Sequence, residues 1–317
     1  MPIQSPRGAL GAPAAPLAAI VGPTASGKSE LAMALAQRLP VEILVADSRQ
    51  VYRGMDIGTA KPDGAARAAV PHHLLDLATP DELFTVADWV ERARDVVAQV
   101  AARGALPLVV GGTGLYVSAL VDGLSPAGRP SPELRAQLNA ELAEGGLDAL
   151  AAHLAERDPM TAARIDLRNP RRVLRALERL AMGEGSGGAN PYPGRLALLG
   201  ISRPREALRQ RIAQRAAWMF ANGLVDEVRR LMSAGYGPDL APMTGHGYRE
   251  AARVAMGEWD VAEAVAVTAR HTAQYAKRQM TWFRRDRRIV WLPAGSGPAD
   301  AAPLLERALA ILRALLA

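Results

Sequence analysis

The segment of this chain with the clearest chemistry is a glycine-rich loop at residues 22–29. Its sequence, GPTASGKS, matches the pattern G-x-x-x-x-G-K-S, in which backbone N–H groups surround a diphosphate. In this pattern the lysine adds a positive charge and the serine hydroxyl binds Mg²⁺. The predicted diphosphate-binding residues are Gly22, Pro23, Thr24, Ala25, Ser26, Gly27, Lys28 and Ser29. Ser29 is also the predicted Mg²⁺ ligand.

The residues on either side of the loop support this interpretation. Residues 17–21 form a short apolar run that is typical of a buried strand, and residues 29–39 have the composition of a helix. A helix that begins at the loop directs the positive end of its dipole towards a bound anion. The loop alone leaves open which diphosphate it binds, and whether a group is hydrolysed or transferred.

Two further segments place polar side chains where strands are predicted to end. Asp47 follows the apolar run 41–46, and Thr113 lies in a glycine-rich segment after the apolar run 105–110. Because ligands bind outside the carboxyl ends of parallel strands, both residues are expected beside the phosphate loop. Asp47 could hold Mg²⁺ through water, or it could accept a proton from a nucleophile. The chain contains no N-K-x-D motif, which argues against a GTPase.

Apolar segments and helical segments alternate over the N-terminal part of the chain, which predicts an α/β fold. The expected architecture is a P-loop NTPase-like parallel sheet with flanking helices and an inserted all-helical domain. The predicted organisation is a flexible N-terminal tail at 1–16, a core with C-terminal helices at 17–124 and 196–317, and a helical insertion at 125–195. In this arrangement the core carries the phosphate loop and the insertion is free to contact a large substrate.

The composition indicates a polyanionic partner. The chain has 317 residues, a formal net charge of +6 and a pI of about 10.0. Arginines cluster at 164–179 and at 270–288, and Trp282 and Phe283 lie within the second cluster, a combination typical of RNA binding. The chain has no cysteine, and no apolar run reaches the roughly 18 residues of a membrane span. We therefore expect a cytoplasmic protein that does not cross a membrane.

Together these motifs resemble the tRNA dimethylallyltransferase family. The resemblance covers residues 17–291 with the motifs in the family's order, and the segment 47–62, DSRQVYRGMDIGTAKP, is far more specific than the phosphate loop. The segments that carry the resemblance are 22–29, 47–62, 71–74, 111–116, 169–178, 247–250 and 276–284.

The resemblance implies an alkyl transfer and no phosphoryl transfer. A dimethylallyl group would move from dimethylallyl diphosphate to the exocyclic N6 amine of the adenosine that is 3′-adjacent to the anticodon, with release of diphosphate. Asp47 would be the general base, Thr113 would lie near the reacting atoms, and the phosphate loop with Mg²⁺ would hold the diphosphate.

The resemblance also implies a binding partner, the anticodon stem-loop of tRNA. Nothing in the sequence demands more than a monomer, so a monomer is expected. The residues that it assigns to tRNA contact are Asp47, Ser48, Arg49, Gln50, Thr113, Arg135, Arg171, Arg172, Arg175, Gly247, Tyr248 and Arg249. The acceptor base would leave its stack to reach the channel, which costs roughly a few kcal/mol, and contacts of the arginines with the RNA backbone would offset that cost.

One departure from the family pattern and two alternative functions leave parts of this interpretation open. Ala273 stands where the family usually has an arginine, and we expect Arg270, three residues earlier on the same helical face, to supply the missing charge. A kinase that uses the same loop with ATP remains an alternative, as does an RNA-binding P-loop protein without catalytic activity. The segment 47–62 and the two arginine clusters favour the transferase.

Overall fold

The computed structural model describes residues 14–123, 130–183, 190–297 and 300–317. Most of the predicted tail at 1–16 lies outside these residues. The described chain divides into a large unit, whose described residues lie within 14–121 and 192–317, and a small unit, whose described residues lie within 122–191.

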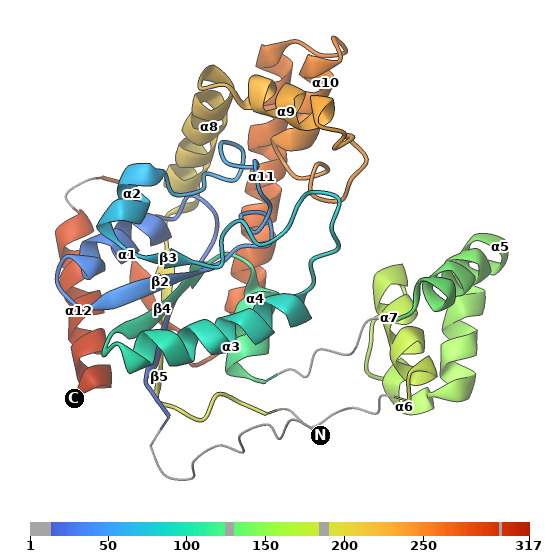
Figure 1. Cartoon of the computed structure of the whole chain (residues 1–317), viewed down its shortest axis with the longest axis horizontal. Coiled ribbons are helices and arrows are strands. Elements are labelled where there is room, and N and C mark those ends of the chain that lie inside the picture. The colour runs from blue at the N-terminus through green and yellow to red at the C-terminus, as the bar shows by residue number, and fades with distance from the viewer. Residues whose placement is uncertain (1–13, 124–129, 184–189, 298–299) are drawn as a thin grey trace, which may run out of the picture. The chain divides into compact units, whose positions relative to one another are not determined.

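The large unit contains a parallel six-stranded sheet in the order β3-β2-β4-β1-β5-β6 (Figure 1). The strands are β1 (Leu17–Val21), β2 (Val41–Ala46), β3 (His72–His73), β4 (Leu106–Gly111), β5 (Leu196–Ser202) and β6 (Val290–Pro293). Every pair of neighbouring strands is parallel, which confirms the predicted α/β fold.

Helices cover both faces of this sheet. They are α1 (Lys28–Ala36), α2 (Gly64–Ala69), α3 (Val86–Ala102), α4 (Gly114–Val121), α8 (Arg205–Ala221), α9 (Leu224–Ser233), α10 (Tyr248–Ala255), α11 (Val261–Phe283) and α12 (Ala301–Leu316). Because side chains alternate along a strand, Ile20 packs in one core with Leu35 of α1 and Leu309 of α12. Val21 packs in the opposite core with Trp89 of α3.

Helix α3 begins at Val86. A capping box sets this start, because the Thr85 hydroxyl accepts a hydrogen bond from the N–H of Asp88 and the Asp88 carboxylate accepts one from the N–H of Thr85. Helices α10 and α12 were not predicted. In α12 the buried residues Leu304, Ala308 and Leu312 recur at helical spacing, a signal that was present in the sequence.

The small unit consists of α5 (Pro132–Arg157), α6 (Pro159–Ala162) and α7 (Pro170–Ala181). The small unit begins at residue 122 and ends at residue 191, whereas the predicted insertion begins at 125 and ends at 195. Helix α5 is interrupted at Gly146, whose φ of +74° few other residues adopt. Leu154 and Val173 are fully buried in a separate apolar core, so the unit has its own packing.

No helix in the described part of the chain is long and apolar enough to cross a membrane.

Candidate active site

The sheet brings the predicted catalytic segments together at the carboxyl ends of three neighbouring strands. The phosphate loop connects β1 to α1, Asp47 follows β2, and Thr113 follows β4. The hydroxyl of Thr113 accepts a hydrogen bond of 3.0 Å from the N–H of Ser48 and so ties the two strand ends together. Asp47 and Thr113 therefore follow neighbouring strand ends that are joined through Ser48.

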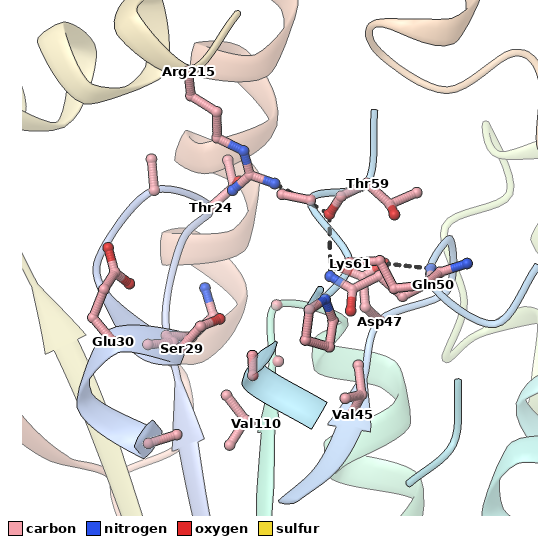
Figure 2. A pocket seen from close by; sticks show the side chains of 18 of the residues that line it. Thr24, Ser29, Glu30, Val45, Asp47, Gln50, Thr59, Lys61, Val110 and Arg215 are labelled. Carbon is pink, nitrogen blue, oxygen red and sulfur yellow. Dashed lines mark hydrogen bonds between the residues drawn. The ribbon is translucent and has the colours of Figure 1, made fainter. Parts of the chain in front are cut away.

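A pocket of about 1030 Å³ opens at this edge of the sheet. The loop residues 24–29 form one wall, Arg215 lies beside Thr24, and Asp47 lies across from Ser29 (Figure 2). Val45 and Val110 supply an apolar floor where β2 and β4 end. A ligand with an anionic group and an apolar group could place the first against the loop and the second against the apolar floor of this pocket.

Lys28 and Arg215 give the pocket two cations that have no carboxylate partner in the described part of the chain. The Lys28 ammonium donates to the carbonyl of Pro23 at 2.7 Å, and Arg215 donates to the Thr24 hydroxyl and the Thr59 carbonyl at 3.4 and 3.2 Å. Desolvation and the charge of Arg215 lower the pKa of Lys28 to about 8. Desolvation also lowers the pKa of Arg215. A bound anion would favour the charged forms of Lys28 and Arg215 and so oppose both pKa decreases. The loop therefore fits a diphosphate.

The lowered pKa of Lys28 predicts a pH-dependent affinity. As pH rises from about 7 to about 9, Lys28 loses its proton in the free protein, and we expect the affinity for inorganic diphosphate to fall more steeply than in Lys28→Met. The variant corrects for the ionisation of diphosphate itself, and titration calorimetry measures both. Equal slopes in the two proteins would contradict this prediction.

The same shift has a consequence for stability with a definite sign. The pKa of Lys28 is lower in the folded chain than in the unfolded one, so between about 8 and 10.5 the unfolded chain binds more protons. Lys28 therefore makes the free energy of unfolding rise with pH in this window.

The sequence did not predict that arginines surround the phosphate loop. Arg203 donates to the carbonyl of Ser26 at 2.8 Å, and Arg211 donates to the carbonyl of Ala25 at 2.9 Å. Arg203 follows β5, and Arg211 and Arg215 lie on α8. The spacing of 211 and 215 by about one helical turn is the feature of the sequence that could have indicated that they share a helix face. Arg270, expected to replace the absent arginine at 273, is exposed and lines neither this pocket nor the one that adjoins it.

Asp47 has one carboxylate oxygen fixed and the other available. Its Oδ1 accepts hydrogen bonds from the N–H groups of Arg49 and Gln50 at 2.8 and 3.4 Å. Its Oδ2 has no hydrogen bond to the described residues. This geometry orients the carboxylate and leaves an acceptor for a proton from a ligand.

Gln279 of α11 joins the phosphate loop to the glycine-rich loop after β4. Its side-chain oxygen accepts from the N–H of Thr24, and its side-chain nitrogen donates to the carbonyl of Gly112, both at 2.9 Å. A Cβ on Gly112 would lie 2.2 Å from this nitrogen, so the glycine is required for the contact. The resemblance included Gln279 in a motif, but its contacts could not be predicted from the sequence.

The segment 47–62 is held by ion pairs that were not predicted. Lys61, with a side chain 1% exposed, donates to the carboxylates of Asp56 and Asp76 and to the carbonyl of Tyr52. Glu227 of α9 accepts from the N–H of Asp56 at 3.1 Å. These contacts fix the loop that follows Asp47.

The residues predicted to contact tRNA occupy different environments in the core. Gln50 points to the carbonyl of Thr59, which also accepts from Arg215 (Figure 2). Arg249 is exposed, whereas Tyr248 is only 1% exposed and its hydroxyl donates to Glu227 at 2.6 Å. Its burial favours a structural role for the Tyr248 side chain in place of an RNA contact.

In the small unit, the predicted arginines divide into two groups. Arg135 and Arg175 donate to the buried carboxylate of Glu178 at 3.0 and 2.8 Å. Arg171 and Arg172 are exposed in the first turn of α7. Arg171 and Arg172 are therefore accessible to an external anion.

The residues present also fit the predicted Mg²⁺. Ser29 is exposed and lines the pocket with Asp47. Magnesium in such sites takes one or two protein oxygens and completes its shell with phosphate oxygens and water, so this donor set is sufficient. No group of three or more His, Asp or Glu side chains suited to a metal occurs among the described residues.

Comparisons with known proteins show the family of this chain. The family model "IPP transferase" matches residues 50–286. A tRNA dimethylallyltransferase of Roseiflexus sp. (strain RS-1) is 46% identical over 306 residues, covering 94% of this chain and 98% of that protein. The crystal structure of the full-length tRNA isopentenylpyrophosphate transferase from Bacillus halodurans is 37% identical, with a TM-score of 0.69 over 94% of this chain and 97% of that one.

A eukaryotic dimethylallyltransferase acting on tRNA shares the fold, with a TM-score of 0.81 at 24% identity over 95% of this chain and 79% of that one. The matched family region contains the segment 50–62 and the arginines of α8. The chain belongs to the tRNA dimethylallyltransferase (IPP transferase) family and is a transferase of this class.

Proposed function

We propose that this chain transfers a dimethylallyl group from dimethylallyl diphosphate to the N6 amine of the adenosine 3′-adjacent to the anticodon of tRNA. The observation that carries the proposal is that Asp47, Lys28 and Arg215 line one pocket. Among the described residues, one Asp47 carboxylate oxygen has no hydrogen bond and neither cation has a carboxylate partner. A base and a diphosphate site in one pocket suit a displacement in which an amine attacks and diphosphate leaves.

In the proposed reaction, the amine nitrogen forms a bond to the first carbon of the allyl group while the bond from that carbon to the diphosphate oxygen breaks. Asp47 accepts the proton that the amine loses, and its fixed Oδ1 keeps Oδ2 directed at the nitrogen. Thr113 holds the neighbouring strand end through Ser48. The role of these residues is to orient the amine and remove its proton.

The leaving group gains negative charge as the bond breaks. Lys28, Arg215 and the N–H groups of the loop are positioned to stabilise that charge. Mg²⁺ held through Ser29 and the phosphate oxygens would add further positive charge.

The exposed pair Arg171 and Arg172 is proposed to bind the RNA backbone. We expect the double substitution to Ala to raise KM for tRNA and to reduce the slope of log affinity against log salt by roughly 1 to 2, with donor KM unchanged. Arg307→Ala, an exposed arginine on α12, is the matched control. Filter binding over a salt series measures the slope, and an unchanged slope in the double variant would count against this contact.

The transferase and the kinase are separated by one pair of assays. The purified protein is mixed with Mg²⁺, labelled dimethylallyl diphosphate and unmodified tRNA, and a parallel reaction contains ATP labelled at the γ-phosphate. Transfer of the prenyl label to RNA without γ-phosphate turnover supports the proposal. Turnover of ATP without prenyl transfer would favour the kinase.

A further inference from the structure

Arg203 follows β5 and joins the phosphate loop to a second part of the core. Its Nε donates to the carbonyl of Ser26 at 2.8 Å, and its Nη1 donates to the carbonyl of Gly295, in the segment between β6 and α12. That segment is itself fixed to the end of β5, because the N–H of Ala294 donates to the carbonyl of Ser202 at 2.8 Å. Arg203 therefore ties the loop to a fixed support.

Arg203 does not belong to the lining of the predicted diphosphate site. It lines neither the diphosphate pocket nor the pocket that adjoins it, and it forms no ion pair in the described part of the chain. Apart from the long-range field of its charge, any effect of Arg203 on a bound diphosphate must therefore pass through the carbonyl of Ser26.

The peptide unit between Ser26 and Gly27 transmits this effect. Because a peptide unit is planar and trans, its C=O and its N–H point in opposite directions. The carbonyl faces Arg203, outside the pocket, so the N–H of Gly27 faces the other way, towards the pocket that Gly27 lines. This N–H forms no hydrogen bond with the described residues. It lies at the start of α1, where the helix dipole favours an anion.

The backbone at Gly27 needs a support of this kind. Its φ is +102°, in the left-handed region that glycine enters freely, and no side chain caps the helix there. A Cβ on Gly27 would lie 3.1 Å from Nη2 of Arg203, so the guanidinium packs directly against this glycine. Without Arg203 the freedom of glycine would let the peptide unit turn away from the pocket.

The preceding peptide unit is held differently. The carbonyl of Ala25 accepts from Arg211 at 2.9 Å, and the N–H of Ser26 in the same unit donates to the carbonyl of Pro23 at 3.3 Å. That unit therefore keeps a hydrogen bond when either contact is removed. In the next unit, Arg203 supplies the hydrogen bond, and the described residues offer no second one.

We propose that Arg203 is a positioning residue for the diphosphate: it holds the carbonyl of Ser26 away from the pocket and so keeps the N–H of Gly27 directed at the leaving group. This inference rests on the proposed function, since it concerns the diphosphate of the same reaction. It assigns a supporting role to the segment before α12, whose Gly295 carbonyl fixes the other end of the guanidinium.

The test compares Arg203→Met and Arg203→Lys with the wild type. Arg205→Met, an exposed arginine at the start of α8 that lines neither pocket, is the matched control. Titration calorimetry with Mg²⁺ and inorganic diphosphate measures Kd at about 0.1 M and about 1 M salt, between which the Debye length falls from about 10 Å to about 3 Å. Steady-state kinetics gives KM for donor and tRNA, and thermal denaturation without ligand reports stability.

Arg203→Met is expected to raise Kd for diphosphate about tenfold, the effect of one misdirected hydrogen bond to a charged group. The factor should be the same at both salt concentrations, because it comes from the orientation of a peptide unit and not from a lost charge. The donor KM should rise in parallel while the tRNA KM stays unchanged. Arg203→Lys, which can still reach the Ser26 carbonyl but lacks the two-pronged geometry, should recover part of the affinity.

Four results would overturn the inference. Arg203→Met keeps the wild-type Kd, or its loss disappears at about 1 M salt, or Arg205→Met loses as much, or the tRNA KM rises by the same factor as the donor KM. If Arg203→Met does not fold, Arg203→Lys is judged by the same criteria. A wild type that neither binds diphosphate nor modifies RNA refutes the proposed function. A wild type that does both, with unchanged affinity in the variants, refutes this inference alone.

Discussion

Asp47→Asn is expected to lower kcat by about a hundred- to ten-thousandfold, the usual contribution of a general base. Asparagine keeps the size of the side chain and an oxygen for the N–H groups of Arg49 and Gln50, so the loop conformation is preserved. Only the ability to accept a proton is lost. The KM values for donor and tRNA should therefore change little, and steady-state kinetics with both substrates measures this difference.

Asp81→Asn, an exposed aspartate that does not line the pocket, is the control for a change of charge alone. A variant at position 47 that retains most of the wild-type kcat would contradict the role of Asp47 as base. A rise in KM at constant kcat would assign Asp47 to substrate binding.

Arg215→Met has the second large expected effect. The substitution removes one of two cations at the phosphate loop and keeps a long apolar stem, so kcat/KM for the donor is expected to fall about ten- to a hundredfold. Without ligand the protein should be no less stable than the wild type, because Arg215 is desolvated, repels Lys28 and has no carboxylate partner among the described residues. Loss of activity without loss of stability distinguishes a binding residue from a structural one.

The control is Arg209→Met, an exposed arginine on the same helix. Thermal denaturation with and without inorganic diphosphate measures both parts of the prediction. A variant at 215 that unfolds at lower temperature and keeps its donor KM would show that Arg215 serves the fold alone.

The sequence predicted the parts of the site that depend on local pattern. Residues 22–29 and the apolar run before them determine the phosphate loop, and the rule that ligands bind at the carboxyl ends of parallel strands places Asp47 and Thr113 beside it. Neither inference needs knowledge of how distant elements pack. In the structure Asp47 lines the pocket together with the loop. Thr113 is joined to the neighbouring strand end through Ser48 and does not line the pocket.

The parts that depend on tertiary contacts could not be predicted in this way. In the sequence, Arg211 and Arg215 are two arginines among several in one helix, a pattern that also suits a solvated face. Only the packing of α8 beside the loop brings them into contact with Ala25 and Thr24. The burial of Tyr248 against Glu227 likewise depends on contacts between α9 and α10, which no local pattern records.

The position of the modified base tests the central claim most directly. Unmodified tRNA with adenosine 3′-adjacent to the anticodon is incubated with the protein, Mg²⁺ and dimethylallyl diphosphate, digested with ribonuclease and analysed by mass spectrometry. We predict one fragment, containing that adenosine, heavier by a dimethylallyl group in place of one hydrogen, and no such fragment with Asp47→Asn. An unmodified tRNA, or the same product in equal amount from Asp47→Asn, would contradict the account.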